Sequence, residues 1–483
     1  MDQDSSDLQK LGYVQELLRD MGGFSSFALS FSVISILTGA TQLYGYGLQH
    51  GGPIEFSLGW LLVSVFTLAI ALSMAELASS YPTAGALYHW SSFLGGRGLG
   101  WFTACFNTIG QFAILAGIDY GLTQFIVSLM GGFSSVGAIS PSPVNIMGGL
   151  NGSALVTLIY VSILLSHALL NHYGIKLVAW LNDFSAAYHI IVVFIILGIL
   201  TLKGFTQPLN FLFKFKLSDG YKPAYSFLIG LLVTQWTLTG YDASAHVTEE
   251  THDPRRNAPW GIFLAVLISM IMGFIMLAAI TLSIKDLDQA VGFGDDAFVK
   301  IMTLRLGVKQ GAAVVGLIAG AMWLCGLASM TSASRMVYAF ARDGGLPFSK
   351  IWAKVNFRHK TPSNAIWGLT LLSLALVLSV RFYSAVVSIA TIALYVSYGL
   401  PIVARLKYRF TKGSDTIGPW NLGKLSNLIS IIAIAWICFI IVLFTLPPNE
   451  QAGKILGGIL IFFFLMWHFE ARKNFPGPKF HLK

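Results

Sequence analysis

The 483-residue chain is poor in charged residues and in cysteine. Asp, Glu, Lys and Arg together make up only 11% of it, whereas 55% of its residues are hydrophobic and its mean hydropathy is +0.69. A soluble core cannot bury so much apolar surface, so we expect lipid to be the solvent. The three cysteines lie inside apolar runs without metal-ligand spacing, which favours packing over disulfides or a metal site: Cys105, Cys325 and Cys438.

Several functional motifs are missing as well. No His-Glu-x-x-His sequence, P-loop or nucleophile elbow occurs, and the polar residues at membrane depth form no catalytic set, so neither an enzyme nor a bound cofactor is expected. Residues 1–20 lack the basic start, apolar stretch and cleavage site of a signal peptide, and we expect no cleaved signal. Strand-like alternation between turns is also absent, which excludes a β-barrel.

Apolar runs of helical length, in contrast, recur along the whole chain. Crossing a hydrocarbon core of roughly 30 Å takes about 20 helical residues. The runs predict an all-α integral membrane protein of about 12 transmembrane helices. The expected spans are 24–49, 56–77, 99–129, 154–170, 176–202, 224–249, 261–284, 311–340, 365–380, 384–405, 425–446 and 455–469.

The basic residues occupy short segments between these runs, such as 342–360 and 405–412. This spacing indicates a topology signal rather than a nucleic-acid surface, despite the net charge of +9. If both termini are cytoplasmic, about two-thirds of the Lys and Arg residues lie on the inner side. We therefore expect a multi-pass protein of the plasma membrane, with 1–21 and 471–483 as cytoplasmic segments.

Two spans are rich in Gly and Thr at mid-length. The first contains Thr38-Gly39-Ala40-Thr41, and the sixth contains Trp236-Thr237-Leu238-Thr239-Gly240-Tyr241-Asp242. The glycines of the two segments lie 201 positions apart (240 − 39). Matching Gly-interrupted spans in two halves are typical of inverted-repeat transporters, whose solute site lies at the breaks. Close helix packing is the alternative interpretation of each cluster.

A break in a membrane helix has chemical consequences. It frees N–H and C=O groups that, in hydrocarbon, only a cavity or a ligand can satisfy. The start of a half-helix suits a carboxylate and the end of the preceding half suits an ammonium, so paired breaks suit a zwitterion. A charge at the bilayer centre costs about 2.5–3.5 kcal/mol on insertion scales, and Asp242 is therefore expected to face protein or water.

At these positions the chain resembles the amino acid-polyamine-organocation superfamily, most closely its amino acid and choline transporter branch, which is similar to γ-aminobutyrate permeases. Three stretches in order carry the resemblance: ELASSYPTAG at 76–85, TGYDASAH with EET at 239–251, and SASRMVYAFARDGGLP at 332–347. The resemblance covers roughly 22–472. It implies two inverted five-helix repeats, at 22–203 and 224–410, with an extracellular loop between them at 204–223. Two peripheral helices are expected to follow at 424–470.

The resemblance also implies residue roles. Trp236 matches a gating aromatic residue, and Asp242 matches an acidic position implicated in substrate or proton handling. Residues 38–41 match the first unwound segment, whose backbone holds the charged ends of the substrate. The implied substrate-binding residues are Thr38, Gly39, Ala40, Thr41, Trp236, Thr237, Thr239, Gly240, Tyr241 and Asp242.

The fifth span concerns ion coupling. His189 stands where several relatives carry a lysine, at a site that holds sodium in sodium-coupled relatives, so the resemblance favours protons over sodium. Histidine gains and loses a proton near neutral pH, and Asp242 is a second coupling candidate. Ser329 is a hydroxyl near the same place. A hydrogen-bonded structural imidazole and ordinary helix packing are the alternatives for His189 and Ser329.

Charged residues also lie near the predicted cytoplasmic ends of several helices. They could close an inner gate by pairing, or they could anchor the helices at the interface. These residues are Glu76, Arg335, Arg342 and Asp343.

The predicted function is secondary active transport of an amino acid or a similar zwitterion such as γ-aminobutyrate, with proton symport or exchange. Choline or a polyamine is the alternative cargo, with Trp236 and Tyr241 around the cation and Asp242 balancing its charge. A solute-sensing membrane receptor is the alternative from another class, although receptors usually add a long tail and 14 residues follow 469 (483 − 469). The expected partners are the solute, protons and membrane lipid, without nucleic acid, and the oligomeric state stays open.

Overall fold

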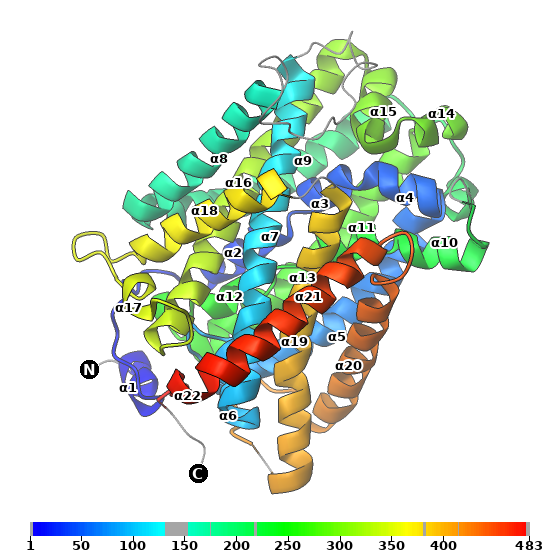
Figure 1. Ribbon diagram of the computed structural model, residues 1–483. Coiled ribbons are helices and arrows are strands. Elements are labelled where there is room, and N and C mark those ends of the chain that lie inside the picture. The colour runs from blue at the N-terminus through cyan, green and yellow to red at the C-terminus, as the bar shows by residue number, and fades with distance from the viewer. Residues whose placement is uncertain are drawn as a thin grey trace.

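The computed structural model describes residues 3–130, 153–173, 175–216, 220–379, 383–413 and 415–479. Within these ranges the chain is helical, and β-type pairing is limited to an isolated bridge between Met21 and Thr251. Ten of the described helical segments are long and apolar enough to cross a membrane. They confirm an all-α integral membrane protein (Figure 1).

The first half of the chain starts with a short polar helix and an interrupted span. These elements are α1 (Gln3–Lys10), α2 (Gly23–Ile34), α3 (Ile36–Gln42) and α4 (Tyr44–His50). The rest of the half comprises η1 (Pro53–Phe56), α5 (Leu58–Ser80), α6 (Leu87–Gly95), α7 (Arg97–Met130), α8 (Ser153–Tyr173) and α9 (Ile175–Leu202). Lipid satisfies no backbone group, so each apolar run closes its own helical hydrogen bonds.

The second half repeats this order after η3 (Leu209–Phe213). Its interrupted span comprises α10 (Pro223–Gly230), α11 (Leu232–Thr237), α12 (Ala243–His246) and η4 (Thr248–Glu250). There follow α13 (Pro254–Leu282), α14 (Leu287–Gly292), η5 (Gly294–Asp296), α15 (Ala297–Leu306), α16 (Val308–Arg342), α17 (Ser349–Trp352), α18 (Ser363–Ser379) and α19 (Tyr383–Lys412). Five spans lie between the start of the first half and the start of the second. Because an odd number of crossings separates them, the second half enters the membrane from the opposite side, and the two repeats are inverted.

A repeated turn supports this internal symmetry. Gly96 precedes the 34-residue α7 at φ 88° and ψ 164°, and Gly307 precedes the 35-residue α16 at φ 86° and ψ 164°. Each glycine N–H donates to the carbonyl four residues earlier, at 2.9 Å for Gly96 and 2.8 Å for Gly307. Both positions require a dihedral that side chains disfavour, so glycine recurs 211 positions apart (307 − 96).

The predicted spans can be compared with the helices of the structure. The sixth is divided into α10, α11 and α12, with the interruption expected at its centre. The ninth, predicted at 365–380, is the 17-residue helix Ser363–Ser379. The last one continues to Asn474 rather than ending at 469, because the backbone extends its helical bonds through a π-helical turn beyond the apolar residues that the prediction followed.

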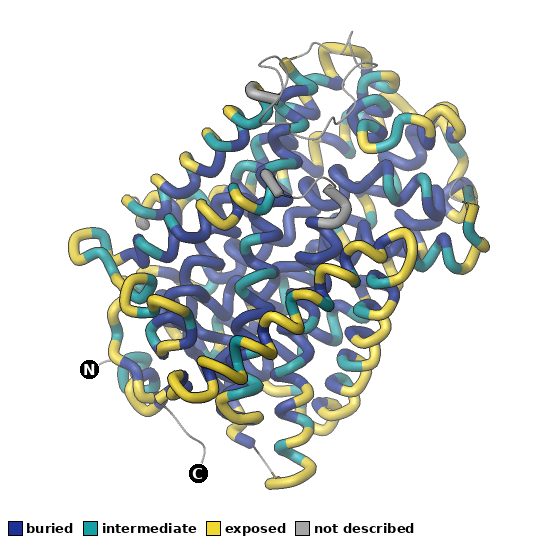
Figure 2. Tube along the Cα trace, in the orientation of Figure 1, coloured by how far each residue is buried: buried dark blue, intermediate teal, exposed yellow. Residues whose placement is uncertain are grey.

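Two peripheral helices complete the bundle, α20 (Ser426–Leu443) and α21 (Glu450–Met466). Figure 2 shows exposed residues along both, while the centre of the bundle is buried. Both chain ends lie on one side with α1 and α17, which we call the termini face (Figure 1). The opposite side carries α4, α10, α14 and α15, and we call it the far face.

Candidate functional site

The two interrupted spans meet inside the bundle. Gly39 in α3 lies so close to α11 that a Cβ atom there would be 2.6 Å from Thr237 Oγ1 and 2.7 Å from Thr237 Cα. A Cβ atom at Gly240 would likewise overlap Val33 in α2. Each interrupted span therefore packs directly against the other, and the two glycine clusters serve a single contact region.

The first interruption is not where the sequence predicted it. Residues Thr38 to Thr41 are helical within α3, and the backbone leaves the helix at Ser35, at φ 33° and ψ 83°. Gly39 is present for close helix approach, because Thr237 leaves no room for a side chain there. The predicted unwound segment is therefore wrong by about one helical turn.

The second interruption lies within the predicted segment. α11 ends at Thr237, α12 begins at Ala243, and Gly240 between them has a φ of +97°. Side chains disfavour that dihedral, so the position requires glycine. The Gly240 N–H donates to the hydroxyl of Tyr398 in α19 at 3.2 Å. A side chain thus replaces one of the helical bonds lost at the break.

Asp242 is fully buried and connects the second break to its neighbours. Its Oδ1 accepts a hydrogen bond from the Tyr398 hydroxyl at 2.7 Å. Its Oδ2 accepts from Asn107 at 3.3 Å and from Gln111 at 3.1 Å, both on α7. His246 Nε2 lies 3.1 Å from the same oxygen. The carboxylate therefore faces protein, as the penalty for a charge in lipid demands.

Asp242 and His246 form a carboxyl–imidazole pair beside the second break. His246 Nε2 lies 3.1 Å from Asp242 Oδ2, and Nδ1 lies 3.2 Å from the carbonyl oxygen of Ala84. The tautomer of the imidazole decides which of its nitrogens donates. The pair brings two ionisable side chains together at the break.

His189 in α9 contacts the first break directly. Its Nδ1 donates to the carbonyl oxygen of Ser185 at 2.7 Å, which leaves Nε2 to accept from Ser35 Oγ at 2.7 Å. Ser35 Oγ also lies 2.6 Å from Thr38 Oγ1. The structure thus brings the predicted coupling histidine to the residue where the first span is interrupted.

Ser329 lies in α16, on the other side of the first break. Its hydroxyl donates to the carbonyl oxygen of Cys325 at 2.9 Å, an ordinary bond within the helix. The Cys325 thiol contacts the Val33 carbonyl oxygen at 3.4 Å, near the end of α2. A cysteine expected only to pack is therefore a neighbour of the break.

The remaining predicted substrate residues are also buried: Ala40, Thr41, Trp236, Thr237, Thr239 and Tyr241. The hydroxyls of Thr237 and Thr239 each donate to the carbonyl four residues earlier, at 2.6 Å. The Tyr241 carbonyl accepts from Ser30 Oγ in α2 at 2.8 Å. Both breaks are thus closed to solvent in this conformation, with several of their polar groups already paired inside the protein.

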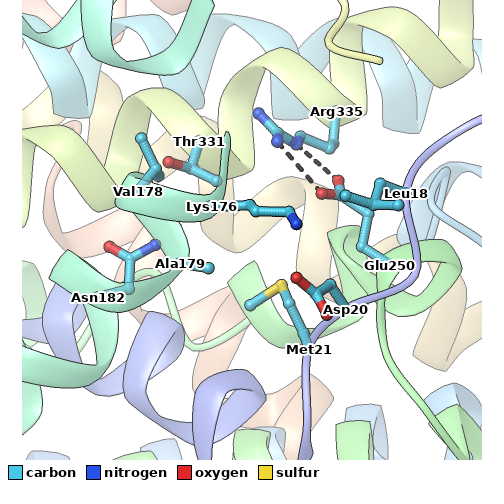
Figure 3. A pocket seen from close by; sticks show the side chains of 10 residues that line it. All are labelled: Leu18, Asp20, Met21, Lys176, Val178, Ala179, Asn182, Glu250, Thr331 and Arg335. Carbon is cyan, nitrogen blue, oxygen red and sulfur yellow. Dashed lines mark hydrogen bonds and ion pairs between the residues drawn. The ribbon is translucent and has the colours of Figure 1, made fainter. Parts of the chain in front are cut away.

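Two bidentate ion pairs close the termini face next to the second break. Glu249 in η4 is fully buried and receives two bonds of 2.9 Å from Arg342 at the end of α16. Glu250 receives bonds of 2.7 and 3.3 Å from Arg335, and Figure 3 shows this pair on the wall of a small pocket. Both arginines therefore join α16 to the segment after the second break, which matches the gate hypothesis more closely than interfacial anchoring.

The N-terminal segment lies over these pairs. The Tyr13 hydroxyl donates to Asp343 Oδ2 at 2.8 Å, and His89 Nε2 is 2.9 Å from the same oxygen. Burial raises the pKa of Asp343. Its hydrogen bond with His89, the charges of His89 and Arg342, and the hydrogen bond from Tyr13 lower this pKa by more, so that it lies below its usual value. Asp343 therefore stays charged at neutral pH and holds the segment in place.

Glu76 belongs to a separate charged cluster. Its Oε2 lies 2.7 Å from Arg405 in α19, and Arg405 also pairs with Asp415 at 2.6 Å. This cluster joins α5 to α19 and the segment that follows it. Glu76 thus has charged partners of its own, apart from those of Arg335 and Arg342, because nearness to a helix end does not say which helices are neighbours.

Sequence reasoning missed several residues at the breaks: Ser35, Asn107, Gln111, His246, Cys325 and Tyr398. His246 carried a readable signal, since it follows Asp242 by four positions and so falls on the same helical face. Tyr398 and Asn107 lie on distant spans, and no local pattern relates them to Asp242. Ser35 gave no turn signal, because serine is common within apolar spans.

Comparison with known proteins agrees with this architecture. The amino acid permease family matches residues 21–468. The amino-acid permease BAT1 of Arabidopsis thaliana is 38% identical, over 99% of this chain and 96% of its own length. A BAT1 homolog of Oryza sativa is 37% identical, over 98% and 94%. The GABA-specific permease of Saccharomyces cerevisiae is 28% identical, over 99% and 86%.

Proposed function

The chain belongs to the amino acid permease family and is an integral membrane amino acid transporter, and we propose that its cargo is a small zwitterion such as γ-aminobutyrate, carried by alternating access. The family match confirms the resemblance to the amino acid-polyamine-organocation superfamily. The GABA-specific permease among the relatives supports a cargo of this kind.

The pairing of the two breaks is the observation that carries the proposal. α3 begins at Ile36 after Ser35, and α12 begins at Ala243 after Asp242. Neither preceding residue makes a side-chain cap hydrogen bond, and α2 and α11 end close by. Helix starts offer N–H groups and helix ends offer carbonyls, so a zwitterion can satisfy both kinds. Lipid satisfies neither. We assign cargo binding to Ser35 and the predicted residues: Thr38, Gly39, Ala40, Thr41, Trp236, Thr237, Thr239, Gly240 and Tyr241.

Transport then follows from a change in which face is closed. The present conformation buries both breaks and pairs the charges of the termini face. A cargo that contacts both interrupted spans binds most tightly when they approach each other, so it stabilises the closed form over either open one. Opening of one face or the other from that form delivers the cargo.

Proton symport is the coupling we propose, with exchange as the other mode. The Asp242–His246 pair lies beside the second break, and His189 bonds Ser35 at the first, so each break has an ionisable neighbour. Ser329, the third predicted coupling residue, is connected to the first break through Cys325, whose carbonyl oxygen accepts its hydroxyl hydrogen bond. A change of protonation at Asp242–His246 or at His189 alters the hydrogen bonds around the nearby break. Proton binding can therefore change the conformation of the interrupted span.

Choline or a polyamine as cargo would need Asp242 as a counter-charge. The rings of Tyr241 and Tyr398 lie beside this carboxylate, with their centroids 5.1 Å apart, and could offer aromatic faces to a cation only if they separated. Asp242, however, already accepts hydrogen bonds from Tyr398, Asn107 and Gln111. These hydrogen bonds stabilise the carboxylate without a cationic cargo, which favours a zwitterion over a bare cation.

We further propose that the termini face is cytoplasmic and that the protein resides in the plasma membrane. The excess of Lys and Arg on the segments of that face supports the orientation. The limits 22–203 and 224–410 are our proposal for the two repeats, and the repeated glycine turns before α7 and α16 support them.

Counterflow into proteoliposomes tests the proposal. The purified protein would be assayed with γ-aminobutyrate, neutral amino acids, choline and putrescine at two pH values, with and without sodium. We expect a zwitterion to exchange and its net uptake to increase in acid. Asp242→Asn should reduce the pH dependence by removing the ionisable carboxyl group of the Asp242–His246 pair, and the exposed Asp253→Asn is the matched control.

Two results would contradict parts of this proposal. Movement of choline alone would exclude the zwitterion. Uptake that requires sodium and ignores pH would exclude proton symport while leaving the transporter assignment intact.

A further inference from the structure

A carboxyl group is buried at the far face, and the described residues give it no hydrogen-bond partner. Glu55 lies in η1 between α4 and α5, and its side chain is 1% exposed. Within the described part of the chain, neither Oε1 nor Oε2 has a hydrogen-bond partner. An isolated carboxylate is very unfavourable in such surroundings, whereas a neutral carboxyl is tolerated.

Three glycines enclose this carboxyl group. A Cβ atom at Gly51 or at Gly230 would overlap the Glu55 side chain, and one at Gly59 would lie 2.7 Å from Oε2. Groups packed this closely leave no room for a hydrated cation. A proton is therefore the partner that neutralises Glu55.

The enclosure is built from both interrupted spans. Gly51 directly follows α4, the far-face part of the first span, and Gly230 ends α10, the far-face part of the second. Gly59 belongs to α5, which η1 precedes. If α4 and α10 separate to open the far face, Glu55 loses its cover and meets water, where a carboxylate is stable at neutral pH.

Charged and titratable groups near the enclosure have other contacts. The backbone N–H of Lys216 donates to the Gly51 carbonyl at 3.0 Å, and its ammonium pairs with Asp288 of α14. Lys214 accepts a backbone bond from Ile54 at 3.3 Å. The charged residues of α5 and α13 lie at the opposite ends of those helices, and η3 has none. The titratable residues of α4 and α10 nearest the enclosure are His50 and Tyr225.

We propose that Glu55 is a proton-binding site that couples the pH of the far side to closure of the far face. Closure takes up one proton and converts the carboxylate to the carboxylic acid, and opening releases the same proton, so no other bond changes. The inference rests on the proposed transport cycle, because only an alternating carrier opens this face. Acid on the far side then favours the closed form.

Cys325 provides a reporter for the test, since its buried thiol lies at the first break. In a background with Cys105→Ala and Cys438→Ala, an impermeant maleimide would be added to the far side of oriented proteoliposomes. The thiolate is the form that reacts, so the labelling rate of Cys325 is divided at each pH by the rate for the same thiol in unfolded protein. We expect this corrected rate to increase with pH by up to about tenfold per unit, the slope of a one-proton equilibrium. Glu55→Gln should label slowly at every pH, because glutamine mimics the protonated acid.

Glu450→Gln is the matched control, since this carboxylate is exposed at the start of α21. It should keep the pH dependence of the parent. A Glu55→Gln variant with the pH dependence of the parent would overturn the proposal. Infrared spectra add a readout that needs no cargo. The carbonyl band of a protonated carboxylic acid should be lost in Glu55→Gln and should remain in Glu450→Gln.

A second pair of variants guards against a folding defect in Glu55→Gln. Gly230→Ala should force the far face open and raise labelling at every pH, because the added methyl overlaps the carboxyl group. Adding Glu55→Ala removes the overlapped atoms and should restore slow labelling without pH dependence. If the double variant still responds to pH as the parent does, another group is the proton site. Failure to find a cargo would affect the proposed function without changing these measurements.

Discussion

The two faces of the bundle are closed by different chemistry. On the termini face, buried Glu249 and Glu250 pair with Arg342 and Arg335. On the far face, shape closes the contact instead: a Cβ atom at Gly45 would overlap the carbonyl oxygen of Gly294 and leave only 3.3 Å to Ala297. Tyr44 stacks on Phe56 there at 4.2 Å.

This difference indicates how each face can be opened. Buried opposite charges depend on each other, because removal of one leaves the other unpaired in a poorly solvated place. Close packing of small residues depends on volume, so it fails when a methyl group is added. The termini face should therefore be sensitive to lost charge, and the far face to added size and to the proton on Glu55.

The largest expected effect comes from Arg342→Met. It leaves Glu249 buried and unpaired, at a penalty of about 3–5 kcal/mol to the closed termini face. Labelling of Cys325 from the termini side should then increase by roughly two to four orders of magnitude, since 1.36 kcal/mol corresponds to a factor of ten. The double variant Glu249→Gln with Arg342→Met should label more slowly than the single one. Equal labelling of parent and single variant would show that this ion pair does not close the face.

A smaller effect is expected from Gly45→Ala at the far face. The added methyl meets the backbone of Gly294, which cannot move aside as a side chain can, and overpacking of this kind costs about 1–3 kcal/mol. Labelling of Cys325 from the far side should increase roughly fivefold to a hundredfold. Gly316→Ala in α16 is the control, since no atom lies within 4 Å of its added Cβ. Increased labelling from the termini side instead would contradict the division into two faces.

The smallest expected effect is the response of the termini face to moderate acid. The pKa of Asp343 in the folded protein lies below its ordinary value of 3.8. The charged carboxylate therefore contributes its full stabilisation of the closed termini face above pH 3.8. This stabilisation is lost only as the pH falls through the lower pKa of the folded protein. The labelling rate of Cys325 from the termini side, corrected in the same way for thiolate formation, should therefore stay constant between about pH 5 and about pH 8. A marked increase within that range would show that a different titratable group holds the N-terminal segment.

Local pattern was sufficient for much of the fold and part of the site. Apolar runs predicted the long helices such as α5 and α13, because lipid allows only spans that satisfy their own backbone. The second break was found because Gly240 is a residue that a positive φ requires. The first was misplaced because Gly39 serves a packing contact, and the sequence alone does not separate the two uses of glycine.

The amino-acid sequence by itself determined that this protein spans a membrane, that it repeats one helical order twice and that Asp242 faces protein, since each follows from hydropathy or from spacing along one helix. Only the tertiary structure decided that Ser35 is the point of interruption, that His246 and Tyr398 are the partners of Asp242, and that Glu55 lies alone among glycines. The physical reason is that hydrogen bonds and close contacts between distant spans depend on how whole helices pack, and that information is not present in any local stretch of residues.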